Sequence, residues 1–344
     1  MGKIRFAVLG AGNIARAHVR PLTTMSNVEI TAIIDAVPER TTAMAALVKE
    51  SLPEAEPRLY TDFDAALADG NFDAVSICLP TWLHASATVK AAAHGCHVLC
   101  EKPMALSLAD ADQMIAAAQK AGVVLSIAQC RRYDNHWLTF KEAVQSGVIG
   151  RPVVWRSIKA GPAPGGRSWF MEADKGGGPL IDGAIHNYDF ARYIFGEAER
   201  VYTSSAKLNG AYSAVDTGTA NITFASGDLL TLSWSWAMPT GVGSGHEDIL
   251  GPEGILYLSP PAGATPPPPP ADANTRYLAV QRPGGEYEYI PCPKNNMYKA
   301  EIEAFIAAIQ SGGTTISDGV DNRKSLAIGL AVLESAANGQ VIKL

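Results

Sequence analysis

The clearest candidates for chemistry are a carboxylate and an imidazole at positions i and i+4. They are Asp182 and His186, and they follow the run Gly176-Gly177-Gly178. Residues with this spacing share one face of an α-helix, so we expect both side chains to point the same way. The carboxylate can then orient or polarise the imidazole, which acts as a general base. The same spacing also occurs in ordinary surface pairs, so this motif alone does not establish catalysis.

A second group is Glu101-Lys102-Pro103, which directly follows a predicted strand over residues 96–100. Parallel sheets bind ligands at the carboxyl ends of their strands. Lys102 at such an end can donate a hydrogen bond to a substrate hydroxyl or accept its proton. The alternative is a lysine that merely lies on the surface at the end of a strand.

The first turn of the chain has the pattern of a dinucleotide site. The sequence Gly10-Ala11-Gly12-Asn13-Ile14-Ala15 separates an apolar run from a predicted helix. Glycine there lets the backbone approach a pyrophosphate, which the helix N-terminus attracts. Asp35 follows at the usual distance of about 20 residues, where a carboxylate binds the ribose hydroxyls of NAD and repels the 2′-phosphate of NADP. NAD is therefore predicted over NADP, although Arg40 can also approach the adenosine.

These groups must be positioned by two different kinds of domain. Residues 1–129 alternate helices with continuous apolar runs, which is typical of a parallel, doubly wound α/β sheet of the Rossmann type. Residues 130–344 contain strands of alternating polarity and a few helices, which predict an α+β domain with a mostly antiparallel sheet. In Asp228–Trp236, for instance, Leu230, Leu232 and Trp234 alternate with Thr231 and Ser233. Pro266–Pro270 predicts an extended connecting loop.

Composition narrows the classes of function. The 344 residues carry a net charge of −6, which argues against a nucleic-acid binder. No apolar run reaches the ~18 residues of a membrane span, and no signal peptide is recognisable at the start. Five scattered cysteines indicate reduced thiols and a cytoplasmic protein. His94, Cys96, His97 and Cys100 lie close together, but their spacing is unusual for zinc, so we predict core packing and no metal.

The motifs together resemble the glucose-fructose oxidoreductase/inositol dehydrogenase family, written Gfo/Idh/MocA. The resemblance extends over nearly the whole chain and rests on the segments GAGNIARAH, DAVSICLPTWLH, EKP, RRYD, SGVIGRP, GGGPLIDGAIHNYD and ESAANGQ. It implies a Rossmann domain and a C-terminal domain whose large open sheet mediates oligomerisation. The expected assembly is a homodimer or a homotetramer.

The resemblance also implies roles for individual residues. The catalytic set maps onto Lys102, Asp182 and His186. Glu101 and Lys102 join the cofactor contacts, and the wall around the nicotinamide maps onto Leu79, Pro80, Thr81, Trp82 and His84. The family often has T-P-N in this wall, so Leu79 and Trp82 depart from its pattern.

Further residues are candidates for substrate contact. Cys130, Arg131 and Tyr133 follow the last predicted strand of the first domain, and Arg131 can hold a carboxylate or a vicinal diol. Trp169 can form a platform for a sugar ring, and it can equally be a core residue. His246 follows a glycine-rich turn and is a weaker candidate.

The sequence thus predicts an NAD-dependent dehydrogenase that oxidises a secondary ring hydroxyl of a sugar, a sugar derivative or a cyclitol. Two alternatives stay open. One is a glycosidase or lyase that oxidises its substrate only transiently. The other is a non-catalytic sensor of NAD and a sugar.

Overall fold

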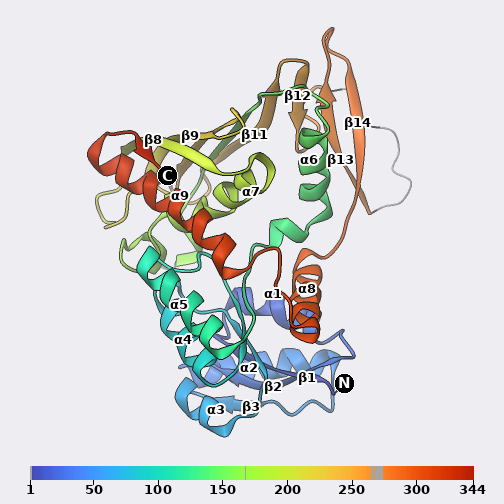
Figure 1. Cartoon of the computed structure of the whole chain (residues 1–344), viewed down its shortest axis with the longest axis vertical. Helices are drawn as coiled ribbons and strands as arrows, with labels where there is room; N and C mark the ends of the chain where they lie inside the picture. Colours follow the sequence, from blue (N-terminus) through green and yellow to red (C-terminus); the bar gives the residue numbers. More distant parts are fainter. Residues whose placement is uncertain (1, 167, 265–266, 268–273) are drawn as a thin grey trace. The chain divides into compact units, whose positions relative to one another are not determined.

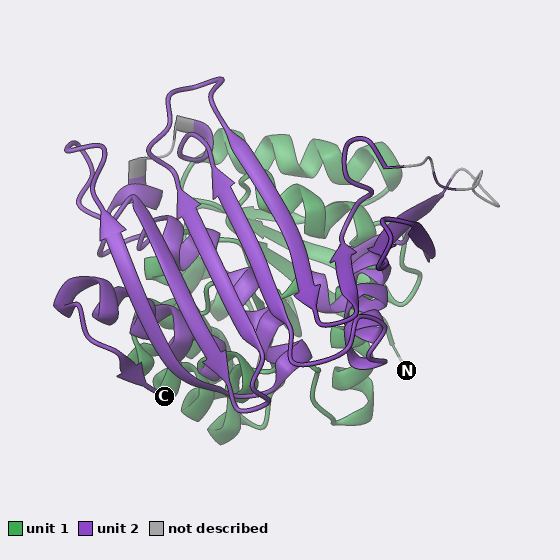
Figure 2. Ribbon diagram, turned by 90° about the horizontal axis from the view of Figure 1, so that it is seen from above, with its two compact units in different colours: residues 1–130, 298–323 green, residues 131–297, 324–344 purple. Residues whose placement is uncertain are grey.

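The computed structural model describes residues 2–166, 168–264, 267 and 274–344. The chain divides into two compact units, which Figure 2 shows in green and purple. Unit 1 comprises Met1–Cys130 and Tyr298–Arg323, and unit 2 comprises Arg131–Met297 and Lys324–Leu344. This division lies one residue from the predicted boundary at 129. It differs from the prediction because Tyr298–Arg323, which was expected in the second domain, belongs to unit 1.

Unit 1 is built on a six-stranded sheet in which every strand pair is parallel. The strand order is β3-β2-β1-β4-β5-β6, the arrangement of a doubly wound dinucleotide-binding sheet. The predicted Rossmann fold is therefore confirmed. Its strands are β1 (Ile4–Leu9), β2 (Val28–Ile34), β3 (Arg58–Tyr60), β4 (Ala74–Ile77), β5 (His97–Cys100) and β6 (Leu125–Ile127) (Figure 1).

The helices of unit 1 show why the late segment belongs to this unit. Phe305 packs edge-to-face on Phe6 of β1, with 6.0 Å between the ring centroids, and Ile302 joins the same buried cluster. Ser107 accepts a hydrogen bond from the amide of Asp110, which confirms the predicted helix start there. The helices are α1 (Asn13–Leu22), α2 (Pro38–Ser51), α3 (Phe63–Asp69), α4 (His84–Ala93), α5 (Leu108–Ala121) and α8 (Met297–Ser311).

Unit 2 is built on a nine-stranded sheet of order β14-β13-β12-β11-β7-β10-β9-β8-β15. Among the described strand pairs of this sheet, β7 and β10 are parallel and the others are antiparallel. The sheet is therefore mostly antiparallel, as predicted. Its strands are β7 (Val154–Ala160), β8 (Ala198–Ala206), β9 (Thr217–Phe224), β10 (Leu229–Ser235), β11 (Ser244–Gly251), β12 (Gly254–Tyr257), β13 (Thr275–Gln281), β14 (Tyr287–Pro293) and β15 (Ile342–Lys343).

The two faces of this sheet differ in chemistry. On the inner face, Leu230, Leu232 and Trp234 are buried in the main core, together with residues of α6 (Asn135–Gln145), α7 (Ile185–Phe195) and α9 (Gly319–Asn338). On the outer face, Thr231 donates a hydrogen bond to Asn221. Figure 2 views this outer face, with the strands in front of the helices of unit 2. The predicted alternation of Asp228–Trp236 is confirmed.

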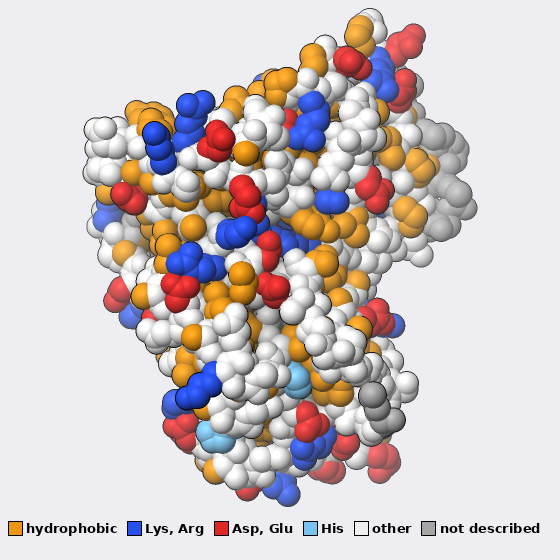
Figure 3. All heavy atoms as spheres, viewed as in Figure 1, with side chains coloured by type: hydrophobic (Ala, Val, Ile, Leu, Met, Phe, Trp, Pro, Cys, Tyr) orange, Lys and Arg blue, Asp and Glu red, His pale blue; other side chains and the backbone are white. Residues whose placement is uncertain are grey.

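The remaining surface features are unexceptional. Positive and negative side chains are interspersed over the face drawn in Figure 3. Among the described residues, no helix is long and apolar enough to span a bilayer. All five cysteines are buried, and Cys96 and Cys100 pack into the interior. Apart from Pro267, the predicted loop Pro266–Pro270 lies outside the described residues.

Candidate active site

The glycine turn of unit 1 has the geometry of an anion cradle. Gly10 follows β1 with φ of +89°, and a Cβ there would lie 2.6 Å from the carbonyl oxygen of Cys78, so only glycine fits. Gly12 is the N-cap of α1 and supplies no side-chain cap. Helix α1 begins at Asn13, and the backbone amides of its first turn, including those of Asn13 and Ile14, have no acceptor within the helix. These amides can therefore bind an anion. The turn therefore fits the pyrophosphate of a dinucleotide.

Asp35 lies directly beside this turn, at the end of β2. Its side chain is buried, and one carboxylate oxygen accepts the amide of Ala11 at 2.8 Å while the other accepts the amide of Val37 at 2.9 Å. Each carboxylate oxygen can accept further hydrogen bonds, so ribose hydroxyls remain compatible with this position. Arg40 is mostly exposed, and its guanidinium lies 3.8 Å from the carboxylate. Asp35 thus fixes the glycine turn as well as offering a negative charge to a ligand.

The predicted nicotinamide wall follows β4. It consists of Leu79 and Pro80, a short turn of 3₁₀-helix over Thr81–Leu83, and His84 at the start of α4. The buried His84 ring has Nδ1 2.8 Å from the Pro103 carbonyl and Nε2 2.8 Å from the Leu79 carbonyl. Carbonyl oxygens only accept, so both nitrogens must carry protons for both contacts to be hydrogen bonds. His84 thereby connects the segment after β4 to the segment after β5, whereas Trp82 is exposed.

Glu101 and Lys102 follow β5. The Glu101 carboxylate is buried, and its oxygens accept from Nε2 of His18 at 3.0 Å and from the backbone amide of Lys102 at 3.1 Å. Burial is the largest single influence and by itself would raise the pKa of Glu101, but the His18 hydrogen bond and the nearby charges of His18, Lys102 and His84 together lower the pKa. Ser76 contacts the other ring nitrogen of His18 at 2.9 Å. Glu101 therefore anchors the backbone that carries Lys102.

A second buried carboxyl in unit 1 has no such support. Glu301 lies on α8, is 1% exposed, and neither of its oxygens has a hydrogen-bond partner among the described residues. Burial raises the pKa of Glu301 well above its ordinary value, and the negative charge of Glu101 adds to this. Burial without a hydrogen-bond partner thus favours the protonated, neutral form of Glu301.

In unit 2, the segment that carries Asp182 and His186 departs from the predicted single helix. Asp182 lies in a π-helical turn, Pro179–Gly183, and His186 lies in the first turn of α7. The turn packs closely, because a Cβ on Gly183 would lie 2.9 Å from the Trp236 ring. The expectation of one regular α-helix over both residues is therefore wrong. A π-turn inserted into a helix is nevertheless frequent at functional sites.

Close to this segment, unit 2 contains a cavity of about 520 Å³ that is open to solvent, with a volume in the usual range for small-molecule sites. We call it the unit 2 cavity. Its lining includes Asn187, the residue directly after His186, and Trp234, whose ring would be 3.1 Å from a Cβ on Gly183. The principal side chains of the lining are Arg131, His136, Trp137, Ser157, Lys159, Asn187, Trp234, His246, Glu247 and Tyr257.

Polar side chains of the lining hold one another in place. Glu247 accepts hydrogen bonds from Ser157 and from Nδ2 of Asn187, both at 3.1 Å. Oδ1 of Asn187 then accepts from Arg131 at 3.1 Å. A carboxylate cannot donate and a guanidinium cannot accept, so this orientation of the Asn187 amide is the only one that satisfies both neighbours. Glu247 thus positions Arg131 through Asn187.

Only some of the residues predicted to contact the substrate line the unit 2 cavity. Arg131 and His246 line the cavity, and His246 also contacts Asp248 at 2.7 Å. Tyr133 is buried and Cys130 is the last residue of the first segment of unit 1, and neither lines the cavity. Trp169 stacks on Phe170, with 3.8 Å between ring centroids, and does not line it either.

Sequence reasoning missed Ser157, Lys159, Asn187, Trp234 and Glu247. The available signal was the alternation of β7 and β10, which places Ser157, Lys159 and Trp234 on the inner face. This alternation could have predicted that polar residues lie on the packed face of the sheet. It could not have predicted that they line one cavity together with Asn187 and Glu247.

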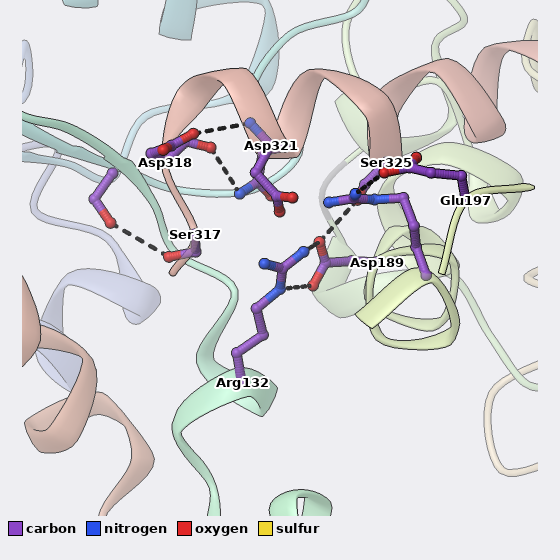
Figure 4. Close-up of polar contacts among 10 residues, drawn as sticks. Arg132, Asp189, Glu197, Ser317, Asp318, Asp321 and Ser325 are labelled. Carbon is purple, nitrogen blue, oxygen red and sulfur yellow. Dashed lines mark hydrogen bonds and ion pairs between the residues drawn. The ribbon is translucent and has the colours of Figure 1, made fainter. Parts of the chain in front are cut away.

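A buried ion pair lies next in sequence to residues of the cavity lining. The Arg132 guanidinium binds both carboxylate oxygens of Asp189, at 2.8 and 2.6 Å, and the two side chains are 2% and 1% exposed. Ser325 donates a further hydrogen bond to Asp189 at 2.8 Å. Figure 4 shows these contacts. Because Arg132 follows Arg131 and Asp189 shares α7 with Asn187, the pair joins the two segments that supply these lining residues.

Comparison with known proteins identifies both parts of the chain. Residues 4–129 match the model of the GFO/IDH/MocA oxidoreductase family with an NAD-binding Rossmann fold. Residues 137–257 match the GFO/IDH/MocA C-terminal domain. Both predicted parts of the resemblance are thus confirmed.

Individual relatives align over almost their full length. A myo-inositol 2-dehydrogenase of Thermotoga maritima is 31% identical over 348 residues, covering 99% of this chain and 98% of the relative. A 1,5-anhydro-D-fructose reductase of Ensifer adhaerens is 29% identical, with coverage of 99% and 98%.

A solved structure is also similar to this chain over nearly its whole length. An Agrobacterium radiobacter oxidoreductase, in complex with NAD⁺, L-tartaric acid and magnesium, superposes with a TM-score of 0.80 at 26% identity, covering 99% of this chain and 98% of that one. From its two matched domains and its full-length relatives, this chain belongs to the GFO/IDH/MocA family of oxidoreductases, with an NAD-binding Rossmann domain.

Proposed function

We propose that this enzyme oxidises a secondary ring hydroxyl of a sugar, a sugar derivative or a cyclitol. The observation that carries the proposal is the unit 2 cavity, which has a volume typical of small-molecule sites and includes the residue next to His186 in its lining. Its polar groups and two tryptophans suit the hydroxyls and the apolar face of a sugar ring. The relatives named for inositol and anhydrofructose support the same class of substrate.

The proposed chemistry uses the three residues that the family resemblance assigns. His186 takes the proton of the substrate hydroxyl as general base, and Asp182 orients His186 or the neighbouring hydroxyl. Lys102 donates a hydrogen bond to the same oxygen and stabilises the negative charge that develops on it. The bound cofactor supplies the acceptor for the hydride of the carbinol carbon. Such positioned acid–base assistance typically contributes about 10²–10⁴-fold to the rate.

We further propose that NAD is preferred over NADP. The support is Asp35, whose buried carboxylate lies next to the glycine turn, where a 2′-phosphate would meet a negative charge. The Arg40 guanidinium lies 3.8 Å from the Asp35 carboxylate and partly offsets its negative charge. We therefore expect NADP to be used less well than NAD rather than to be excluded.

The assembly proposed is a homodimer or a homotetramer. The outer face of the unit 2 sheet exposes Ile158 and Tyr202, each 44% exposed, among hydroxyl side chains. Apolar groups on an open sheet favour association, and symmetric closed assemblies are the usual outcome. A light-scattering mass of a single chain across micromolar concentrations would contradict this.

The direct test of the activity is a panel of cyclitols, aldoses and methyl glycosides, assayed at 340 nm with NAD and with NADP. We expect net formation of NADH with at least one ring polyol. Cleavage of a glycoside without accumulation of NADH would instead support a lyase or glycosidase. Binding without either reaction would support a sensor.

A further inference from the structure

One imidazole in the interior of unit 1 connects three elements next to the Lys102 segment. His18 lies on α1, its side chain is fully buried, and its Nε2 is 3.0 Å from one carboxylate oxygen of Glu101. Its Nδ1 is 2.9 Å from the hydroxyl of Ser76 on β4. The other oxygen of Glu101 accepts the backbone amide of Lys102, which follows β5. Continuous contacts therefore lead from α1 through Glu101 to the backbone of Lys102.

The partners of His18 determine where its ring carries a proton. A carboxylate only accepts hydrogen bonds, so Nε2 must carry the proton that Glu101 accepts. The Ser76 hydroxyl can donate to Nδ1 or accept from it, so this second contact is satisfied in either state of the ring. Tyr298 of α8 packs beside the imidazole, with 6.1 Å between the ring centroids. The ring is therefore held in one place and presents a donor to Glu101.

The other ionisable groups that act on Glu101 do not replace this donor. Burial raises the pKa of four of them and favours their neutral forms. These four are Cys78, Cys100, Tyr298 and Glu301. The charges of Lys102 and His84 lower the pKa of Glu101, but among the described side chains only His18 donates a hydrogen bond to it. Loss of His18 should therefore affect Glu101 most.

We propose that His18 is a positioning residue for Lys102, because it holds the Glu101 carboxylate in the orientation in which Glu101 accepts the Lys102 amide. This inference rests on the proposed function, in which Lys102 contacts the reacting oxygen. An ionised carboxylate accepts an N–H group more strongly than a neutral carboxyl does. His18 thus directs one oxygen of Glu101, favours the ionised form, and leaves the other oxygen for the amide. It acts through Glu101 and is assigned no contact with the substrate.

Two amide substitutions separate this hydrogen bond from the packing of the ring. The amide nitrogen of glutamine is as many bonds from the backbone as Nε2 of histidine, and that of asparagine as many as Nδ1. His18→Gln can therefore keep the donor to Glu101, whereas His18→Asn directs its amide toward Ser76. At pH 7, with NAD and the best polyol of the panel, we expect His18→Asn to lower kcat roughly 10- to 100-fold and His18→Gln less than about threefold. The KM for the polyol and the Kd for NADH should change less than kcat.

The pH profile of kcat tests the ionisation of Glu101. Without the His18 donor, burial favours the neutral carboxyl, and the pKa of Glu101 rises. The loss of kcat in His18→Asn relative to the wild type should therefore shrink severalfold between about pH 6 and pH 9, as Glu101 ionises. The double variant His18→Asn/Glu101→Gln should lack this change, because glutamine does not titrate.

The matched control is the same substitution at another histidine of unit 1. His97 begins β5, whereas Lys102 follows the end of that strand, and Nδ1 of His97 accepts the amide of Val124 at 3.0 Å. The pH profile of kcat for His97→Asn should follow that of the wild type. Near-normal kcat of His18→Asn at pH 6, or equal losses in His18→Gln and His18→Asn at every pH, would overturn the proposed role of His18.

Hydrogen exchange tests the inference independently of turnover. Mass spectrometry of overlapping fragments from the NADH-loaded protein follows the backbone amide of Lys102. This amide should exchange faster in His18→Asn than in the wild type and in His18→Gln, whether or not a polyol of the panel is oxidised. Faster exchange without turnover in any of the three proteins would support the positioning of Lys102 and reject the dehydrogenase. Equal exchange in all three would reject the positioning role and leave the dehydrogenase to be judged by its turnover.

Discussion

The two units hold their functional groups in different ways. In unit 1, backbone geometry does most of the positioning. Gly10 adopts a left-handed conformation, and Asp35 is fixed by two backbone amides. In unit 2, side chains position other side chains, as Glu247 does with Arg131 through Asn187. A cradle made of backbone suits a constant ligand, whereas a cavity made of side chains can change its specificity by substitution. We therefore expect cofactor and substrate properties to be separable by mutation.

The largest effect should come from His186→Ala. Loss of the proposed general base is expected to lower kcat by about 10²–10⁴-fold. The cofactor contacts named above belong to unit 1, so the dissociation constant for NADH, measured by fluorescence, should stay close to that of the wild type. Asp182→Asn should cost less if it only orients the base. Near-normal turnover of His186→Ala would reject the assignment and make Lys102 the leading candidate for the base.

Asp189→Ala should have the next largest effect, on stability. It leaves the Arg132 guanidinium buried and without this carboxylate, which typically costs about 3–5 kcal/mol. Urea denaturation followed by tryptophan fluorescence reports mainly on unit 2, because every tryptophan except Trp82 lies there. The control is Glu288→Ala, which removes the 59% exposed partner of Arg282, a half-exposed pair of unit 2, and should change stability much less. Equal unfolding midpoints for Asp189→Ala and the wild type would refute a supporting role.

A smaller, cofactor-specific effect is expected from Asp35→Ser combined with Ala36→Arg. Removal of the carboxylate and addition of a cation should shift the NADP-to-NAD ratio of kcat/KM by roughly 10- to 100-fold toward NADP. The relative order of substrates in the sugar panel should not change, because their proposed contacts lie in unit 2. A wild type that already prefers NADP would show that the interpretation of Asp35 is wrong.

Glu301→Gln should have the smallest effect, and its sign depends on pH. The folded protein holds Glu301 protonated with a pKa raised above its ordinary value of 4.5, so the folded state binds a proton that the unfolded state releases at higher pH. The wild type therefore loses stability as pH rises above about 4.5, and Glu301→Gln does not. We expect similar stabilities near pH 4.5 and a growing advantage in the free energy of unfolding for the variant as the pH rises to 8.

The control for this experiment lies on the same helix. Glu303→Gln alters an exposed residue that pairs with Lys299 at 3.9 Å, so its stability should follow that of the wild type at both pH values. A constant difference between Glu301→Gln and the wild type across this range would show that Glu301 does not carry an altered proton affinity.

The same contrast between the units explains what could be predicted from sequence. Gly10, Asp35 and Ser107 act through neighbours in the chain or across one strand, so a local pattern was sufficient to predict their structural setting. Lys159, Asn187 and Glu247 meet only after β7, α7 and β11 come together, and no spacing in the chain encodes that meeting. The π-turn at Asp182 was likewise missed, because the i, i+4 spacing looks the same in a regular helix. The return of Tyr298–Arg323 to unit 1 depends on packing such as that of Phe305 on Phe6.

The central claim is that a hydride leaves a ring carbon of the substrate and reduces the cofactor. The most direct measurement uses the best polyol of the panel, deuterated at every ring carbon, and mass spectrometry of both products. The account predicts one deuterium in each reduced cofactor, one ketone formed per NADH, and a slower rate where hydride transfer limits turnover. Reduced cofactor without deuterium, or substrate conversion without net NADH, would contradict it.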